Sequence, residues 1–339
     1  MAEITPDIVR EHLAKIEGQN ITVQGLRQEF NLLPGTKSFD NIRSIVHRLV
    51  QQKILREVGR RGEYRVIKQI QPVRVFIPGR ERRPVFNLRF PQDRQRQIEI
   101  DIAESIIIRE GDLITIGGVK SKGKTAMCLN FAAENIDKRP VLMGNEYTVF
   151  TEGEYQPAPR FFNRLEDMKE WTNWIDDEGY DKFILLPVRE DYAEHIARDK
   201  INIIDWINID ANQLYDISKV LEDIKSSLGK GIGIVAIQKG EGAINPRGGQ
   251  FVRDFSDVEI LLDGFGNSDD NILMTIKGVK EKKRNIVGKT YAFSITANGT
   301  QIWNFREVEP CRECKGSGFT KGSKCDNCLG RKYVDIGGF

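Results

Sequence analysis

The sequence predicts an α/β protein: a doubly wound, mostly parallel sheet with a small helical module before it and a cysteine-rich tail after it. Apolar, strand-like runs alternate with helical segments between residues 98 and 308. This spacing is typical of sheets with helices on both faces. A glycine-rich turn follows the first clear apolar run, and four of the five cysteines lie close together near the end of the chain.

Length and charge indicate how many domains and which kinds of partner to expect. A chain of 339 residues is long enough for one sizeable core and smaller modules, so two or three domains are expected. The net charge of +2 points to no partner, but residues 53–96 hold 13 Lys and Arg against 4 Asp and Glu. No apolar stretch reaches the ~20 residues that cross a bilayer, and no signal-peptide core begins the chain. A soluble, cytoplasmic protein without membrane contact is predicted.

Residues 1–67 predict three short helices followed by a β-hairpin. Thr5 and Pro6 can open the first helix, while Thr22 and Ser38 can cap the second and third. The third helix has apolar residues at helical spacing, and two short strands flank the basic turn GRRG at 59–62.

This module resembles a winged helix-turn-helix. The resemblance implies that duplex DNA contacts Arg43, His47 and Arg48 on the third helix, and Arg60 and Arg61 on the wing. The alternative is a protein-docking module whose polar helix face is only solvated. Residues 68–97 contain four prolines among many arginines and are interpreted as a basic linker, which either touches phosphate or a neighbouring subunit or is simply solvated.

The core, residues 98–308, carries the predicted sheet. A mostly parallel centre is expected, with an antiparallel extension at one edge where two late strands are joined by a basic segment. The expected strands are 113–116, 141–143, 183–188, 201–204, 232–237, 258–262, 272–276 and 291–295.

The glycine-rich turn is a complete phosphate-loop motif, G-x-x-x-x-G-K-T, between a strand and a helix. Its backbone N–H groups and the following helix N-terminus suit nucleotide phosphates. Lys124 can neutralise the β- and γ-phosphates, and Thr125 can bind Mg²⁺. Whether the extra lysines contact phosphate or only solvent is open. The predicted nucleotide-binding residues are Gly118, Val119, Lys120, Ser121, Lys122, Gly123, Lys124, Thr125 and Ala126.

Polar residues at the ends of other strands complete the predicted catalytic site. Asp205 ends an apolar run and is expected to hold Mg²⁺ through water, with Asp210 as the weaker candidate. Glu146, which follows the second strand, can polarise an attacking water, although an exposed loop carboxylate is the alternative. Gln238 can sense the γ-phosphate and relay its presence to the glycine-rich loop 239–249.

The order of these motifs resembles the RecA-fold ATPases, and among them the motors of bacterial and phage hexameric replicative helicases. The segment Lys282-Lys-Arg284-Asn285 is similar to an element of that family that reaches the nucleotide of a neighbouring subunit. The resemblance implies ATP and Mg²⁺ as cofactors, a homo-oligomer such as a hexameric ring, and a bacterial or phage-infected cell. Lys282 and Arg284 would then act on a neighbour's transferred phosphoryl group. Alternatively, they belong to a basic surface hairpin.

The chain departs from that family in two places. The N-terminal collar of the helicases is replaced by the helical module, and residues 147–182 do not follow the motor pattern. Both departures leave strand unwinding in doubt more than ATP hydrolysis. Single-stranded DNA is expected at the core loops, with Lys239 and Arg247 as contacts.

The tail, residues 309–339, contains the pattern C-x₂-C-x₁₀-C-x₂-C formed by Cys311, Cys314, Cys325 and Cys328. Four thiolates at this spacing predict one structural Zn²⁺. A redox dithiol is the alternative. The glycines after each pair resemble the CxxCxGxG modules of J-domain-type chaperones, except that Lys332 replaces the last glycine. Nucleic acid and a replication or recombination protein are both candidate partners of the tail.

These expectations combine into a DNA-associated, oligomeric ATPase of the replicative-helicase or helicase-loader type. The alternative is an ATP-switched DNA-binding regulator or a recombinase-like assembly factor without unwinding activity. A small-molecule kinase is a third option, which the Lys282–Asn285 segment and the DNA-binding-like modules disfavour.

Overall fold

The computed structural model describes residues 4–59, 62–68, 72, 74, 76, 84–100, 102–207, 216–240, 242–266 and 268–336. The chain forms two compact units, residues 1–80 and 81–339. Within the described ranges, no helix is both long and apolar enough to cross a membrane.

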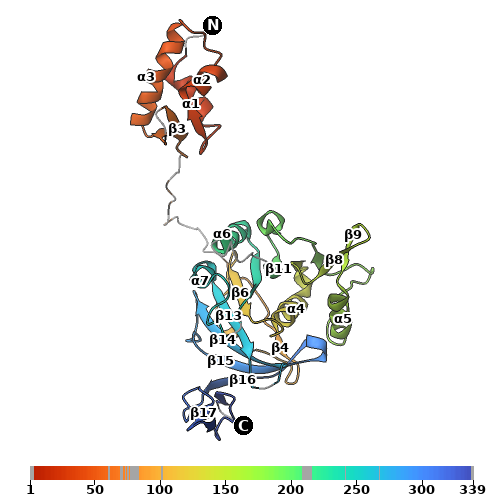
Figure 1. Cartoon of the computed structure of the whole chain (residues 1–339). Coiled ribbons are helices and arrows are strands. Elements are labelled where there is room, and N and C mark those ends of the chain that lie inside the picture. The colour runs from red at the N-terminus through yellow and green to blue at the C-terminus, as the bar shows by residue number, and fades with distance from the viewer. Residues whose placement is uncertain are drawn as a thin grey trace. The chain divides into compact units, whose positions relative to one another are not determined.

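The first unit packs helices against a small antiparallel sheet with the strand order β1-β3-β2 (Figure 1). Thr5 and Thr22 cap their helices as expected. The third helix is capped by Thr36 rather than Ser38, because the helix begins at Lys37 and residue 38 already lies in its first turn. The elements are α1 (Pro6–Leu13), β1 (Asn20–Thr22), α2 (Val23–Glu29), α3 (Lys37–Gln51), β2 (Leu55–Glu57) and β3 (Glu63–Val66).

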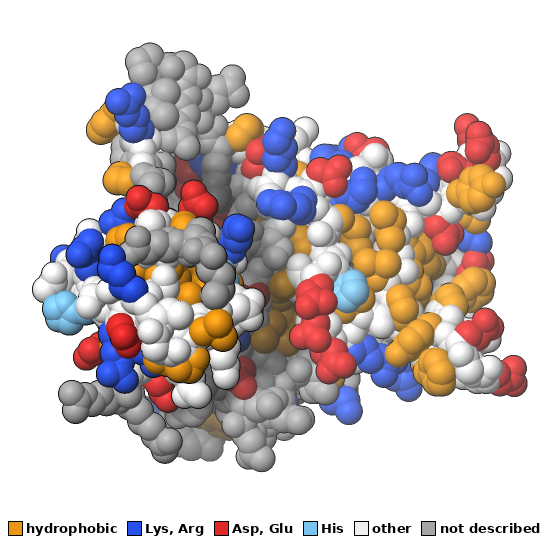
Figure 2. Space-filling view, turned by 90° about the horizontal axis from the view of Figure 1, so that it is seen from above, with side chains coloured by type: hydrophobic (Ala, Val, Ile, Leu, Met, Phe, Trp, Pro, Cys, Tyr) orange, Lys and Arg blue, Asp and Glu red, His pale blue; other side chains and the backbone are white. Residues whose placement is uncertain are grey.

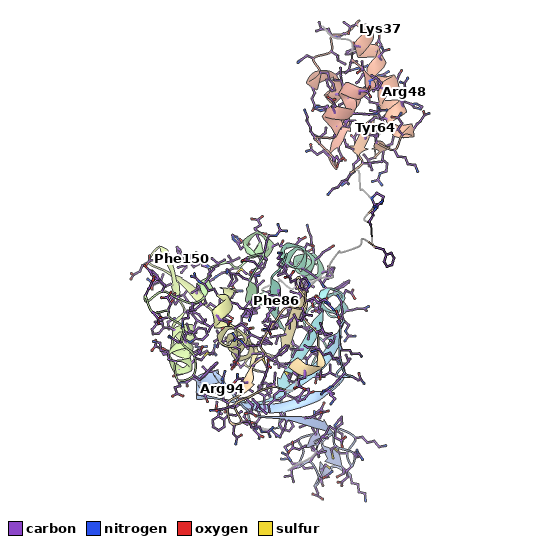
Figure 3. The ribbon with its side chains drawn as sticks, turned by 180° about the vertical axis from the view of Figure 1, so that it is seen from behind. Lys37, Arg48, Tyr64, Phe86, Arg94 and Phe150 are labelled. Atoms are coloured by element: carbon purple, nitrogen blue, oxygen red, sulfur yellow. The ribbon has the colours of Figure 1, made fainter. Side chains whose placement is uncertain are left out.

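Helix α3 divides into a buried and an exposed face. Ile42, Ile45 and Leu49 are buried in the core of this unit, as the helical spacing predicts. The side chains of Arg43, His47 and Arg48 are exposed on the other face, and Figure 3 shows Arg48 at the surface of the unit. The basic, polar face is therefore free of intramolecular packing.

The second unit is built on one large mixed sheet whose order, among the described strands, is β10-β7-β11-β12-β6-β13-β14-β15-β16-β4-β5, with β19 also paired to β16 (Figure 1). Neighbouring strands from β10 to β13 are parallel. Strand β14 runs antiparallel to both β13 and β15. The parallel centre and antiparallel extension are as expected, and the α/β fold class with a mostly parallel central sheet is confirmed.

All eight expected strands are present. Seven have nearly the expected bounds, whereas β10 is shorter than the run 183–188. Their bounds are β6 (Leu113–Gly118), β7 (Val141–Met143), β10 (Ile184–Leu185), β11 (Ile201–Ile207), β12 (Ile232–Gln238), β13 (Val258–Gly264), β14 (Asn271–Val279) and β15 (Thr290–Thr296). The sequence did not predict β4 (Gln92–Asp93), β5 (Ile98–Glu99), the hairpin β8 (Thr148–Thr151) and β9 (Glu154–Pro157), β16 (Gln301–Pro310), β17 (Phe319–Thr320), β18 (Ser323–Lys324) and β19 (Tyr333–Asp335).

Helices cover both faces of the parallel strands. Along β12, Ile234 and Ala236 pack in the cluster that contains α4, whereas Val235 and Ile237 pack in the cluster that contains α6 and α7. Consecutive strand residues point to opposite faces, so this apolar run requires cover on both sides. The helices are α4 (Lys124–Glu134), α5 (Pro159–Met168), α6 (Asp216–Ser227) and α7 (Gln250–Phe255), with 3₁₀ turns that include η3 (Tyr192–His195) and η5 (Ala297–Gly299).

The second half of the predicted linker belongs to this core. Leu88 and Phe90 are buried in the main apolar cluster. Asp93 is 1% exposed and accepts a hydrogen bond from the backbone N–H of Phe305. The prolines interrupt regular secondary structure here but do not prevent packing, so residues 84–97 are part of the core unit rather than a linker.

Candidate nucleotide site and zinc centre

The phosphate loop joins β6 to α4 as predicted. Gly123 is the N-cap residue before α4, with φ 80°, and a Cβ at this position would lie 2.6 Å from Ile295 Cδ1. A side chain here would be strained by both backbone and packing. Lys124 is 7% exposed, and its Nζ donates hydrogen bonds to the carbonyl oxygens of Gly118 and Val119 at 3.0 and 2.9 Å. Burial lowers the pKa of Lys124, while the nearby Asp205 acts to raise it. The loop therefore holds a preformed ammonium group where phosphates would arrive.

A cavity of 570 Å³ opens at this loop. It is large enough for a nucleotide, since small-molecule sites are commonly ~300–1,000 Å³. The predicted residues Glu146 and Gln238 line it together with the loop itself. Lys122, whose role the sequence left open, pairs with Asp269 at 2.6 Å, whereas Lys120 is an exposed lining residue.

Asp205 lies on β11, which is separated from β6 by β12. The side chain is completely buried, and neither carboxylate oxygen has a hydrogen-bond partner among the described residues. Burial raises the pKa of Asp205 to about 6, and the negative charge of Glu146 adds to the shift, whereas the Thr125 hydroxyl and Lys124 oppose it. Asp205 does not itself line the cavity, but Thr125 beside it does. An unpartnered carboxylate next to this threonine hydroxyl fits a magnesium site. The weaker candidate Asp210 lies outside the described residues.

Close backbone packing holds Glu146 beside Asp205. The backbone N–H of Glu146 donates to the Asp205 carbonyl oxygen at 3.2 Å. Trp206, which follows Asp205 through a cis peptide bond, donates its indole N–H to Glu146 Oε1 at 3.1 Å. Glu146 is exposed to the cavity and thus has the access that a water-polarising carboxylate needs.

Two arginines in this cavity were not among the predicted site residues. Arg160 and Arg164 are on α5 and line the cavity together with Gly299. Arg164 Nε donates to the Asn298 carbonyl oxygen at 3.5 Å, which ties α5 to η5. Their i, i+4 spacing was the available signal, but nothing in the sequence places α5 against the phosphate loop.

The residues predicted to contact nucleic acid lie in different environments. Arg43, His47 and Arg48 are exposed on α3, whereas Arg60 and Arg61 lie outside the described residues. Lys239 is 5% exposed and forms an ion pair with Asp263, so its ammonium group is not on the surface as expected for a DNA contact. Arg247 lines the nucleotide cavity instead of an open loop surface. The sequence could not distinguish these environments, because both residues belong to one glycine-rich loop.

Lys282 and Arg284 do not line the nucleotide cavity of their own chain. They lie in the loop 280–289, after β14, where the backbone N–H of Lys280 bonds to the Asp257 carbonyl oxygen just before β13. Because β14 is antiparallel to β13, and β13 is parallel to β6, this loop is at the opposite sheet edge from the phosphate loop. The strands separate the two edges by about 20 Å at ~3.3 Å per residue. Both side chains are exposed, and Arg284 lies 3.6 Å from Glu104.

The four tail cysteines converge at a single point. Their Sγ atoms all lie within 4.8 Å of one another, and all four side chains are buried. Cys311 Sγ is 3.8 Å from Cys325 Sγ, and Cys314 Sγ is 3.6 Å from Cys328 Sγ. Four ligands at ~2.3 Å around one tetrahedral Zn²⁺ are about 3.8 Å apart, whereas a disulfide needs ~2.0 Å. The backbone N–H of Gly318 donates to Cys314 Sγ at 3.2 Å. The cluster fits structural zinc.

The zinc module is attached to the core sheet. Strand β19 pairs antiparallel with β16, and Tyr333 packs on Phe265 and Val308. The same module and the β13–β14 turn border a larger groove of 1360 Å³ that extends to Lys122 of the phosphate loop.

Neither a protein-family model nor a curated protein sequence matches the chain. Among solved structures it is similar to the RadB recombinase, with 16% identity, a TM-score of 0.42, and coverage of 57% of this chain and 91% of that one. It is also similar to a KaiC-like protein from the hyperthermophilic archaeon Pyrococcus horikoshii OT3, with 16% identity, a TM-score of 0.45, and coverage of 65% of this chain and 100% of that one. The α/β fold is therefore argued from the strand order of the chain itself.

Proposed function

We propose that this protein is a DNA-associated ATP hydrolase that works as a head-to-tail homo-oligomer, as a replicative-helicase-type or helicase-loader-type motor. One observation carries the proposal: residues 120–126 of the phosphate loop and Glu146 line one cavity, with Asp205 buried beside Glu146, while Lys282 and Arg284 lie at the opposite edge of the sheet. A second chain placed head to tail would bring its loop 280–289, called the basic loop below, to this cavity. Head-to-tail contacts of this kind generate rings or filaments.

In the proposed reaction each group has a distinct task. Lys124 would turn from the loop carbonyls to the β- and γ-phosphates, and Thr125 and Asp205 would hold Mg²⁺, which would supply charge neutralisation. Glu146 orients the attacking water, and Gln238 at the end of β12 contacts the γ-phosphate. Lys282 and Arg284 of the neighbouring chain stabilise the charge that develops on the transferred phosphoryl group.

A mixing experiment tests the shared site. Lys124→Ala and Arg284→Ala chains should each lose ATP turnover by 10³-fold or so, which is on the order of an arginine-finger loss. Mixed together, they should recover part of the activity, because some interfaces then join an intact phosphate loop to an intact basic loop. Turnover that stays at the level of the separate variants, although sedimentation detects mixed oligomers, would contradict the proposal.

DNA dependence tests the motor. ATP turnover is measured without DNA, with single-stranded DNA and with duplex DNA, and is followed by a strand-displacement assay. Stimulation by single strands with displacement of the complementary strand supports a helicase-type motor. Stimulation without displacement supports a loader or a recombinase-like factor.

The first unit favours a second candidate, an ATP-switched regulator that binds a duplex site. Helix α3 exposes Arg43, His47 and Arg48 on one face, which suits a major groove and its phosphates. A variant with alanine in place of Arg43, His47 and Arg48 should bind duplex DNA at least 10-fold more weakly than the wild type. Its ATP turnover without DNA should remain unchanged. Site-specific duplex binding, combined with no stimulation of turnover by single strands, would favour the regulator over the motor.

A further inference from the structure

The hairpin formed by β8 and β9 extends the chain directly from the nucleotide cavity. It begins two residues after Glu146, and its base is fixed in the core by Tyr147, which is fully buried 5.0 Å from the Phe161 ring. Arg189 Nη2 also donates to the Thr148 carbonyl oxygen at 2.9 Å. The hairpin is thus firmly held at the rim of the site.

Its outer part presents apolar rings to solvent. Phe150 and Tyr155 face each other across the two strands with ring centroids 5.1 Å apart, and are 62% and 49% exposed. Figure 3 shows Phe150 at the outer edge of the unit, and Figure 2 shows hydrophobic and acidic side chains on the side where β8 and β9 lie in Figure 1. Two large exposed rings on a rigid hairpin are typical of a contact surface.

The charge of the hairpin limits what it can contact. Residues 148–157 contain Glu152 and Glu154 but no lysine or arginine. Glu152 and Gly153 form the two-residue turn with φ 56° and 90°, a conformation that favours Asn, Asp or Gly over Glu. The carboxylate at the tip is therefore kept at a cost in backbone strain. DNA phosphates would be repelled by this tip, and a basic protein surface would be attracted.

A complementary surface exists in the loop 280–289, at the opposite edge of the sheet. Lys282 and Lys283 are exposed there and form no ion pair with a described residue. Val287 adds a partly exposed apolar side chain, 38% exposed. The two surfaces cannot meet within one chain, because the strands of the sheet lie between them.

We propose that the hairpin 148–157 docks onto the basic loop 280–289 of a second copy of this chain. The rings of Phe150 and Tyr155 cover Val287 and the aliphatic part of Lys283, while Glu152 and Glu154 face the ammonium group of Lys283 and leave Lys282 and Arg284 to the nucleotide. This inference rests on the proposed head-to-tail ATPase. It adds the element that aligns the neighbour's loop with the cavity and thereby positions Lys282 and Arg284.

Cross-linking of full-length chains tests this contact. A Glu152→Cys/Lys283→Cys chain is treated with a short bismaleimide in the presence of Mg²⁺ and a non-hydrolysable ATP analogue, with the wild type as background because its cysteines are buried. A ladder of covalent oligomers is expected, since the two cysteines of one chain are too far apart to react with each other. The matched control is Glu152→Cys/Lys230→Cys, because Lys230 is also exposed and precedes β12 at the same sheet edge. It should give no ladder.

Replacement of the rings provides the second arm. Phe150→Ser/Tyr155→Ser should raise the protein concentration at half-assembly in sedimentation by about 10-fold or more. Its thermal unfolding should be unchanged, because both rings are largely exposed.

The outcomes separate this contact from the proposed function. Assembly of the ring variant at wild-type concentrations, the absence of a ladder from Glu152→Cys/Lys283→Cys, or an equal ladder from the Lys230 control each overturns the hairpin contact and leaves the ATPase proposal intact. A wild-type chain that hydrolyses ATP as a monomer overturns both.

Discussion

Gly144 determines how closely Glu146 and Asp205 approach each other. Its φ is 115°, and a Cβ there would lie 2.4 Å from the Asp205 carbonyl oxygen. Both the backbone conformation and the space exclude a side chain at this position. The end of β7 can therefore pack directly on β11, which places Asp205 beside Glu146 at the rim of the cavity.

Replacing Gly144 tests this packing. Gly144→Ala should lower the free energy of unfolding of the core unit by about 2–5 kcal/mol, because rigid backbone atoms must move. Gly153→Ala is the matched control, since Gly153 has φ 90° but open space around the position of a Cβ, and should cost only about 1 kcal/mol. Urea unfolding measures both. Equal losses in the two variants would contradict a steric role for Gly144.

The buried carboxylate of Asp205 makes stability depend on pH. Its pKa is about 6 in the fold against 3.8 for the unperturbed group, so the folded chain prefers the neutral form. The destabilisation is absent below about pH 4, develops between pH 4 and 6, and is complete above pH 6, where it amounts to about 3 kcal/mol. In the absence of nucleotide and metal, Asp205→Asn should therefore stabilise the chain above pH 6 and have little effect at pH 4. Urea unfolding at several pH values measures the difference, and a pH-independent difference would contradict it.

The same pKa predicts the pH dependence of nucleotide binding. Magnesium binds the ionised carboxylate, so the affinity for Mg²⁺-ATP should fall as the pH drops below about 6, by up to about 10-fold per unit. Asp205→Asn should bind weakly and without this transition. Fluorescence titration between pH 5 and 8 distinguishes the two profiles.

Helix α5 brings two arginines to a cavity otherwise built by the loops at the ends of the strands. We expect Arg164→Ala to weaken Mg²⁺-ATP binding by about 10- to 100-fold, because charged hydrogen bonds contribute about 1.5–3 kcal/mol. Lys169→Ala is the matched control, since Lys169 follows the same helix and pairs with Glu166 away from the cavity. Calorimetric titration measures both affinities. A wild-type affinity in Arg164→Ala would exclude a nucleotide contact by this side chain.

The direction of β14 determines where the basic loop lies. A parallel strand after β13 would have ended at the phosphate-loop edge and left Lys282 and Arg284 beside their own nucleotide. The antiparallel turn instead carries them to the other edge. Strand direction is set by hydrogen-bonded pairing between distant segments, which the residues of the loop do not encode by themselves.

At the level of the whole molecule, zinc should stabilise only the tail. One Zn²⁺ per chain is expected, and a chelator should remove hydrogen-exchange protection from residues 311–335 while β6, β11 and β12 keep theirs. Cys325→Ser should lose the metal. Cys128→Ala should keep it, because Cys128 is buried in the main apolar cluster of the core. Loss of protection throughout the core on chelation would contradict a separate zinc module.

Much of this organisation is readable in the sequence, with identifiable exceptions. Buried parallel strands such as β12 are continuous apolar runs, so their positions were predictable. Strand β16 was missed because it is partly exposed, and Arg306, Glu307 and Glu309 interrupt any regular alternation. The segment 84–91 was interpreted as linker because of its prolines, although Leu88 and Phe90 are buried. Whether such a segment forms a strand or packs in the core depends on its pairing and contacts with remote segments.

Local spacing in the sequence specifies two sites, the phosphate loop and the zinc cluster. A phosphate loop needs its glycines, Lys124 and Thr125 within a few residues, and the zinc cluster needs two close cysteine pairs. Both motifs can therefore be recognised in short stretches of the sequence. The tertiary structure sets the environment of the remaining groups. It buried Asp205 without a partner, paired Lys239 with Asp263, and brought Arg164 into the cavity. It also separated Lys282 and Arg284 from their own nucleotide site. Burial, pairing and distance arise from contacts between remote segments, which no short motif contains.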